Sequence, residues 1–105
     1  MITLAVALAL LAPNPATIDG PRRAFASCLK GFESKNLAQK IDAAAYETMV
    51  KTACQAEASG LLDALVRYDV AMGTKRAAAT ANAERDLDDY RATSSDRYRD
   101  IVTNQ

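Results

Sequence analysis

Residues 42–72 read DAAAYETMVKTACQAEASGLLDALVRYDVAM, and this stretch decides the fold. Its apolar side chains recur at steps of three or four residues, the spacing that places side chains along one face of an α-helix. They are Tyr46, Val50, Cys54, Ala58, Leu61, Leu65, Tyr68 and Met72. Asp42 precedes three alanines and suits an N-cap, whereas Gly73 suits a C-terminal cap because glycine adopts the left-handed conformation without a steric cost. We therefore predict one helix from Asp42 to Met72.

Two glycines leave alternatives open, one within this stretch and one directly after it. Gly60 costs about 1 kcal/mol relative to alanine in a helix interior, unless it marks a close crossing with another helix. At Gly73 the chain either turns or continues as one long helix from Asp42 to Ile101. We favour the turn.

A shorter helix is expected before this stretch. The sequence Asp19-Gly20-Pro21 is a start signal, because proline at the first helical position loses no hydrogen bond. Apolar residues then follow at the spacing i, i+3, i+4 and i+7, which indicates an amphipathic helix. They are Phe25, Cys28, Leu29 and Phe32. The polar segment Ser34–Lys40 is expected to form the turn between the two helices, although it can also partly continue the first.

After Gly73 the chain resumes a helical pattern from Lys75 to Ile101. Its stripe is thinner than the previous one and consists of Ala83, Leu87, Tyr90, Ser94, Tyr98 and Ile101. Thr93, Ser94 and Ser95 are residues that can interrupt the helix and cap a final piece. No strand pattern is present, so the predicted fold is all-α: a small three-helix bundle in which a short helix is joined by a disulfide to a long helical hairpin.

The N-terminal residues have the features of an export signal. Ile2 to Ala12 is an apolar run without a charge, and Pro13, Asn14, Pro15 and Ala16 follow it. Such a run is typical of a secretory signal peptide and is too short to span a bilayer, so we expect no stable membrane span. No lysine or arginine precedes it, which leaves a hydrophobic helix of the fold or an uncleaved anchor as alternatives. We predict a signal peptide at residues 1–16, a single helical domain at 17–105, and a periplasmic or secreted protein.

The two cysteines are predicted to form one disulfide. Cys28 and Cys54 each lie on the apolar face of an expected helix. In a chain that enters an oxidising compartment, such a pair indicates a disulfide bond. The alternative is a cytosolic protein with two unpaired buried thiols.

The composition argues against several functional classes. The chain has 13 basic and 13 acidic residues and no histidine. A neutral chain lacks the positive field that binds nucleic acid, and without histidine there is no histidine-based triad or histidine metal ligand. The cysteines lack a Cys-x-x-Cys spacing, and no glycine-rich phosphate loop occurs. We therefore expect no enzyme, no metal and no cofactor.

One acidic cluster has residue types that can hold a metal ion. It consists of Glu84, Asp86, Asp88 and Asp89. Oxygen ligands of this kind bind divalent cations, or they can act as an acid and base pair. On a helix, however, they divide between two faces, and Arg85 and Arg91 lie among them. We interpret the cluster as a solvated helix face.

A candidate interaction surface lies near the C-terminus. There Tyr90 precedes Arg91, and Tyr98 precedes Arg99. Tyrosine and arginine are enriched where proteins bind one another. The alternative is that both tyrosines belong to the core and the arginines pair on the helix surface.

The sequence predicts a small exported helical protein that acts by binding. The first hypothesis is a protein-interaction module, an accessory or inhibitor of the cell envelope, whose partner is another protein or a second copy of the chain. The second is a helical bundle that binds a small ligand or a lipid in an internal pocket. The residues expected around that pocket are Phe25, Phe32, Leu61, Leu65 and Met72.

Overall fold

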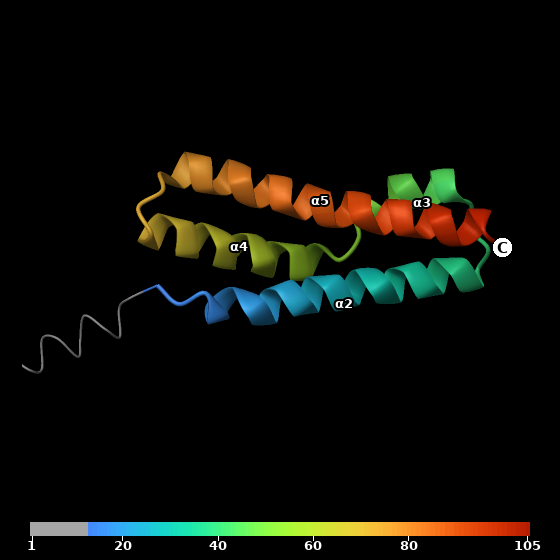
Figure 1. Ribbon diagram of the computed structural model, residues 1–105, viewed down its shortest axis with the longest axis horizontal. Coiled ribbons are helices and arrows are strands. Elements are labelled where there is room, and N and C mark those ends of the chain that lie inside the picture. The colour runs from blue at the N-terminus through green and yellow to red at the C-terminus, as the bar shows by residue number, and fades with distance from the viewer. Residues whose placement is uncertain (1–12) are drawn as a thin grey trace, which may run out of the picture.

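The computed structural model describes residues 13–105, and this part of the chain is all-helical (Figure 1). It contains α2 (Ala16–Ala38), α3 (Ala43–Val50), α4 (Gln55–Ala71) and α5 (Arg76–Thr103). Helices α2 and α5 run in the same direction, and α3 followed by α4 forms the return between them. The all-helical bundle is confirmed, but the described residues form four helices rather than three. The predicted signal peptide lies almost wholly in residues 1–12, outside the described residues, and stays a prediction.

Helix α2 is longer at both ends than the sequence pattern suggested. It begins at Ala16, ahead of the Asp19-Gly20-Pro21 signal, because the Asn14 side chain accepts a hydrogen bond from the Ala16 N–H at 3.0 Å. It also continues to Ala38, so the turn is confined to residues 39–42. The polar segment does not end the helix because Asn36 faces the core, where its side chain donates to the Phe32 carbonyl at 2.8 Å.

The predicted continuous helix from Asp42 to Met72 is wrong at one point. Its start is confirmed, since Asp42 Oδ1 accepts from the Ala45 N–H at 2.8 Å. The helix stops at Val50 and resumes at Gln55, and Cys54 between them has φ 59°, in the left-handed region. The interruption turns the chain so that α3 packs on the C-terminal half of α5, while α4 packs on α2 and on the N-terminal half of α5 (Figure 1).

The turn at Gly73 is confirmed. Its φ of 103° is readily adopted only by glycine, and the single long helix from Asp42 to Ile101 is thereby excluded. Helix α5 then runs to Thr103, and the interruption that residues 93–95 would allow is absent. Ser94 and Ser95 are buried among the other helices, where Ser94 finds hydrogen-bond partners within the bundle.

The core follows the predicted stripes and includes several of their aromatic side chains. The fully buried large side chains include Tyr46, Tyr98, Phe25, Leu29 and Leu61. A second cluster, made of Val66, Ala79 and Ala83, joins α4 to α5 near the Gly73 turn. The last residues of two predicted stripes are exposed: Met72 is 61% and Ile101 37% exposed. Within residues 13–105, none of the helices combines the length and hydrophobicity that crossing a bilayer requires.

Gly60→Ala is expected to raise the free energy of unfolding by about 1 kcal/mol, because alanine is the better helix former. A Cβ atom at this position meets nothing within 4 Å, so the added methyl group strains no neighbour. Chemical denaturation of the two proteins side by side measures the difference. Gly73→Ala serves as the opposite control and is expected to destabilise, since alanine disfavours a positive φ. A destabilising Gly60→Ala would contradict the open surroundings of this residue.

Candidate functional site

A chain of buried polar contacts joins three of the helices. Glu33 of α2 is 5% exposed and accepts hydrogen bonds at both carboxylate oxygens. Arg97 donates from Nε to Oε1 at 2.8 Å and from Nη2 to Oε2 at 2.5 Å, and Ser94 donates to Oε2 at 2.8 Å. The Tyr46 hydroxyl lies 2.7 Å from the Ser94 hydroxyl oxygen. Because the single Ser94 proton points to Glu33, Tyr46 is the donor in that bond.

The surroundings of this polar chain favour an ionised Glu33 and a neutral Tyr46. Burial raises the pKa of Glu33, but the hydrogen bonds from Arg97 and Ser94 and the charge of Arg97 outweigh it, so the pKa lies below its ordinary value. Burial also raises the pKa of Tyr46, which keeps its phenol neutral. With every oxygen of the carboxylate occupied, Glu33 orients α2, α3 and α5 relative to one another and is not available as a general base.

The Glu33 carboxylate is expected to make stability depend on acidic pH. A group whose pKa is lowered by folding stabilises above its unfolded value, here about 4.5, and loses that contribution as the pH falls through the lower folded value. Denaturation between pH 7 and pH 3 should therefore show wild-type stability falling below about pH 4.5, with a weaker fall in Glu33→Gln. Glu84→Gln, which changes an exposed acid on α5, is the matched control and should follow the wild type. Identical pH profiles for wild type and Glu33→Gln would contradict the assignment.

Stacked aromatic rings extend the polar chain into the core. The Tyr46 and Tyr98 rings are nearly parallel, with centroids 3.9 Å apart and an interplanar angle of 4°. The centroid of the Phe32 ring, on α2, lies 5.6 Å from the centroid of the Tyr46 ring. The Tyr98 hydroxyl donates to the Ile41 carbonyl, and burial raises the pKa of this phenol. Helix α3 is therefore fixed on α5 by one ring stack and one chain of hydroxyl groups.

The burial of Glu33 was not predicted from the sequence, because a charged residue is rarely found in a core unless it is paired. Its partner Arg97 is only partly buried, with 40% of its side chain exposed. A signal was present, since Glu33 follows Phe25 and Leu29 at steps of four and so continues the buried face of α2. Asn36 lies three residues further along that face. Ser94 had been placed on the α5 stripe, but its partners came from helices whose relative positions the sequence did not reveal.

The predicted surface of tyrosines and arginines does not form one exposed patch. Tyr98 is fully buried. Tyr90 is half-buried with its ring 5.5 Å from Phe25, and its hydroxyl accepts from Arg22 Nη1 at 2.9 Å.

The two arginines of that surface make contacts within the chain. Arg91 donates from Nη2 to the Ala53 carbonyl at 2.9 Å, and its guanidinium lies 5.3 Å from the Phe25 ring centroid. Arg99 pairs with Glu47 of α3 at 2.8 Å on the surface. All four residues thus contact another part of the bundle, and Arg99 does so while half of its side chain stays exposed.

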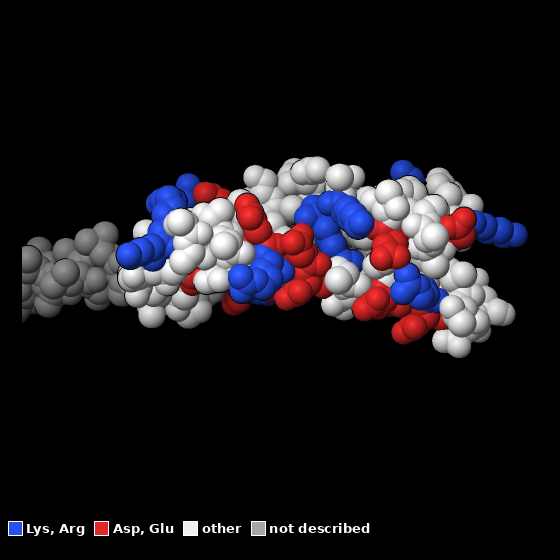
Figure 2. Space-filling view, turned by 90° about the horizontal axis from the view of Figure 1, so that it is seen from above, with Lys and Arg blue, Asp and Glu red and all other residues white. Residues whose placement is uncertain are grey.

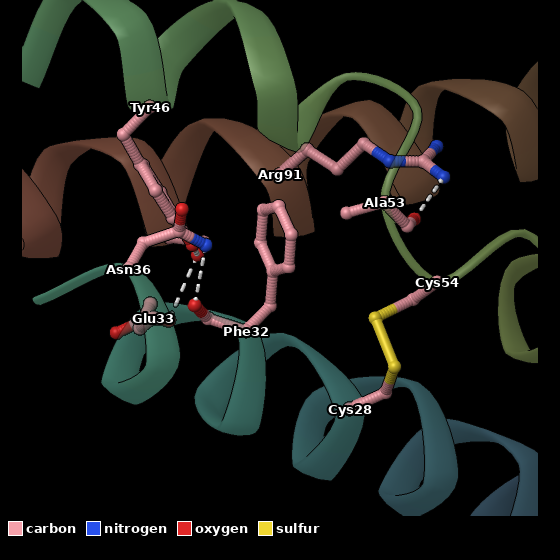
Figure 3. The surroundings of a disulfide bond; sticks show 9 residues. Cys28, Phe32, Glu33, Asn36, Tyr46, Ala53, Cys54 and Arg91 are labelled. Carbon is pink, nitrogen blue, oxygen red and sulfur yellow. Dashed lines mark hydrogen bonds between the residues drawn. A yellow bond between two sulfur atoms is a disulfide. The ribbon is translucent and has the colours of Figure 1, made fainter. Parts of the chain in front are cut away.

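The predicted disulfide is present. Cys28 of α2 and Cys54 at the helix interruption are bonded, with their Cα atoms 6.1 Å apart (Figure 3). Both residues are half-buried. The bond ties the interruption directly to the middle of α2.

The acidic cluster does not converge on one point. Asp86 pairs with Arg22 at 3.3 Å, and Glu84, Asp88 and Asp89 are exposed along α5. In residues 13–105, no group of three or more histidine, cysteine, aspartate or glutamate side chains is arranged to hold a metal ion. Figure 2 shows acidic and basic side chains interspersed over the visible face, without a large area of one sign.

The residues expected around an internal ligand pocket do not line one. Phe25 and Leu61 have no exposed surface, and Met72 lies at the surface. Phe32 and Leu65 pack against the same core. These side chains fill the interior of the bundle.

Two surface hollows flank the outer face of α4. Its exposed residues are Ala56, Ser59, Gly60, Asp63 and Arg67, and we call them the α4 face. A groove of about 640 Å³ separates this face from the N-terminal end of α2, and one of about 400 Å³ separates it from α5. Gly60 and Asp63 line both grooves. The α4 face is therefore a low ridge between two hollows.

Comparisons with protein-family models, with curated proteins and with solved structures give no match to this chain. No relative therefore supplies a function for it.

Proposed function

We propose that this protein acts by binding another protein through the α4 face, as an exported accessory or inhibitor module of the cell envelope. The observation that carries the proposal is the place of Gly60, which lines both grooves beside α4. Like Gly20 and Gly31 of α2, it lies in a helix interior with open space where a side chain would be. Glycine destabilises this position by about 1 kcal/mol relative to alanine, and no contact within the chain makes use of the missing side chain.

A partner helix laid along α4 is the occupant that these hollows fit best. Helices pack by inserting the ridges of one into the grooves of the other, and small residues at the crossing let the two backbones approach closely. Gly60 lowers the ridge where the two grooves meet, and Ala56 and Ala64 lie one turn to either side. A second helix placed there would direct side chains into the grooves toward α2 and toward α5.

The charges of the α4 face favour a protein partner over a polyanion. Asp63 and Arg67 form an exposed ion pair at 3.2 Å, so the face carries balanced charge. A surface for nucleic acid or an anionic membrane would require an excess of basic residues. The polar pair at the edge of a small-residue surface matches the polar rim of protein interfaces.

Two features support the proposed periplasmic or secreted location: the disulfide and the apolar N-terminal run. Disulfides persist in oxidising compartments and are rare in the cytosol. The Cys28 to Cys54 bond supports a periplasmic or secreted location. Intact-mass analysis of the protein from its native host, with and without reduction, tests this directly; thiols that are free before reduction would contradict it.

Site-specific photo-crosslinking tests the binding function. A photoreactive amino acid at Ser59, on the α4 face, is expected to give one discrete adduct in native-host cells. Gly60→Trp in the same chain should abolish the adduct, because the indole fills the hollow that the partner requires. Ala81→Trp, at an exposed position of α5, is the matched control and should leave it intact.

The adduct's mass also identifies the kind of partner. Twice the mass of the chain means self-association, and any other discrete protein mass means a different partner. No adduct, or equal loss in Gly60→Trp and Ala81→Trp when both variants melt like the wild type, would contradict binding through α4. A bound small molecule retained through purification instead would favour the ligand-binding alternative and the 640 Å³ groove as its site.

A further inference from the structure

The interruption between α3 and α4 has no cause in the local sequence. Residues 51–54 read Lys-Thr-Ala-Cys and contain neither glycine nor proline. The apolar spacing of Val50, Cys54 and Ala58 continues across them at steps of four. Left to its local preferences, this segment would join the two helices into one.

The disulfide is the first tertiary contact that opposes that preference. Cys54 is bonded to Cys28 of α2 and adopts φ 59°, ψ 44°, a conformation that is unfavourable for a residue with a Cβ atom. The neighbouring N–H groups of Thr52 and Ala53 bond to carbonyls three residues back, at 3.4 and 3.2 Å, rather than four. The backbone is thus drawn toward α2 at the bonded cysteine.

Arg91 is the second such contact. Its Nη2 donates to the Ala53 carbonyl, which in an uninterrupted helix would accept the N–H of Glu57 (Figure 3). The guanidinium lies over the Phe25 ring of α2. Arg91 therefore satisfies a carbonyl that the interruption leaves open.

We propose that the segment 51–54 is a redox-sensitive switch: reduction of the Cys28 to Cys54 bond lets Cys54 leave the left-handed conformation and joins α3 and α4 into one helix. The reductant is a dithiol. One of its thiolates attacks one cysteine sulfur, so that the Cys28 to Cys54 bond breaks and the other cysteine leaves as a thiolate that takes up a proton. The second thiol, as a thiolate, then attacks the dithiol's own sulfur in the mixed disulfide and displaces the first cysteine, which also takes up a proton. The products are two cysteine thiols and the oxidised dithiol, so two electrons and two protons are transferred.

Joining the helices changes the surface of the bundle. The axes of α3 and α4 are offset in the oxidised protein (Figure 1). A straight helix that keeps Ala58 and Leu61 in the core shifts α3 from its present position on α5. The inference goes beyond the proposed binding function and does not depend on the α4 face having a partner.

Nuclear magnetic resonance of the full chain, oxidised and in excess dithiol at pH 7, tests the switch. On reduction, the backbone carbon shifts of residues 51–54 should become helical, and exchange of the amide protons of residues 54–57 should slow on the order of tenfold. The double variant Cys28→Ala with Cys54→Ala should match the reduced protein without any reductant. The variant Cys28→Ala with Cys54→Gly should keep the interruption, because glycine accepts the left-handed conformation.

Three results would overturn the proposal. In the first, the reduced protein keeps the left-handed shifts at Cys54, which would mean that Arg91 and the packing of α3 suffice to hold the interruption. In the second, reduction unfolds the whole bundle, since a switch requires α2, α4 and α5 to persist. In the third, the alanine and glycine double variants give the same spectra, which would show that the conformation of residue 54 does not determine whether α3 and α4 join.

Discussion

Tyr46→Ala is expected to lower the free energy of unfolding by about 4 kcal/mol, the range found when a fully buried aromatic side chain is truncated. Tyr46 has no exposed surface and contacts three side chains of the other helices: the Tyr98 ring, the Phe32 ring and the Ser94 hydroxyl. Its loss leaves a cavity between α2, α3 and α5. Urea denaturation at pH 7, followed by circular dichroism, measures the change.

Tyr46→Phe separates the two contributions of this side chain. It keeps the ring stack and removes the hydrogen bond to Ser94, so we expect a loss of only about 1 kcal/mol. Tyr68→Ala, at a half-buried position of α4, is the matched control and should cost less than Tyr46→Ala. Equal losses for Tyr46→Phe and Tyr46→Ala would show that the hydroxyl chain, and not the aromatic packing, fixes α3.

Removal of the disulfide is expected to have the second large effect. The cysteines are 26 residues apart. For a loop of this size the chain-entropy model gives a stabilisation of about 3.5 kcal/mol. Relief of the left-handed conformation at Cys54 offsets part of that loss. In a domain of this size, melting should therefore occur about 15 °C lower in the double variant Cys28→Ala with Cys54→Ala.

Calorimetry with and without a dithiol gives the measurement and its control. The wild type should melt lower when reduced, and the double variant should not respond to the reductant. An unchanged melting temperature in wild type whose two thiols have been shown to be free would contradict a stabilising role for the bond.

Local sequence determined the elements whose causes lie within a few residues. Gly73 ends a helix because a positive φ suits glycine, and Asp42 begins one because its side chain caps the Ala45 N–H. The cysteine pairing also followed from the sequence, since Cys28 and Cys54 were placed on the apolar faces of neighbouring helices. Periodicity identified most of the core, because side chains at steps of three and four must share a face.

Tertiary structure decided what depends on partners far away in the chain. Residues 51–54 have a helical pattern, yet the helix is interrupted there, where Cys54 is bonded to Cys28 and the Ala53 carbonyl accepts from Arg91. Conversely, the serines of α5 that were expected to break that helix are buried within it, because Glu33 of α2 offers Ser94 a hydrogen-bond partner.

For the candidate site too, the sequence indicated some of the residues, and the tertiary structure decided what they contact. The tyrosines at 90 and 98 were recognised as notable, but whether they face a partner or the core depended on where Phe25, Arg22 and Ile41 lie. Gly60 was noticed as a weak point in a helix, and the grooves beside it exist only once α2 and α5 pack against α4. Local propensities are worth a few tenths to about 1 kcal/mol per residue, so a disulfide or a buried hydrogen-bonded charge outweighs them wherever the fold brings one close.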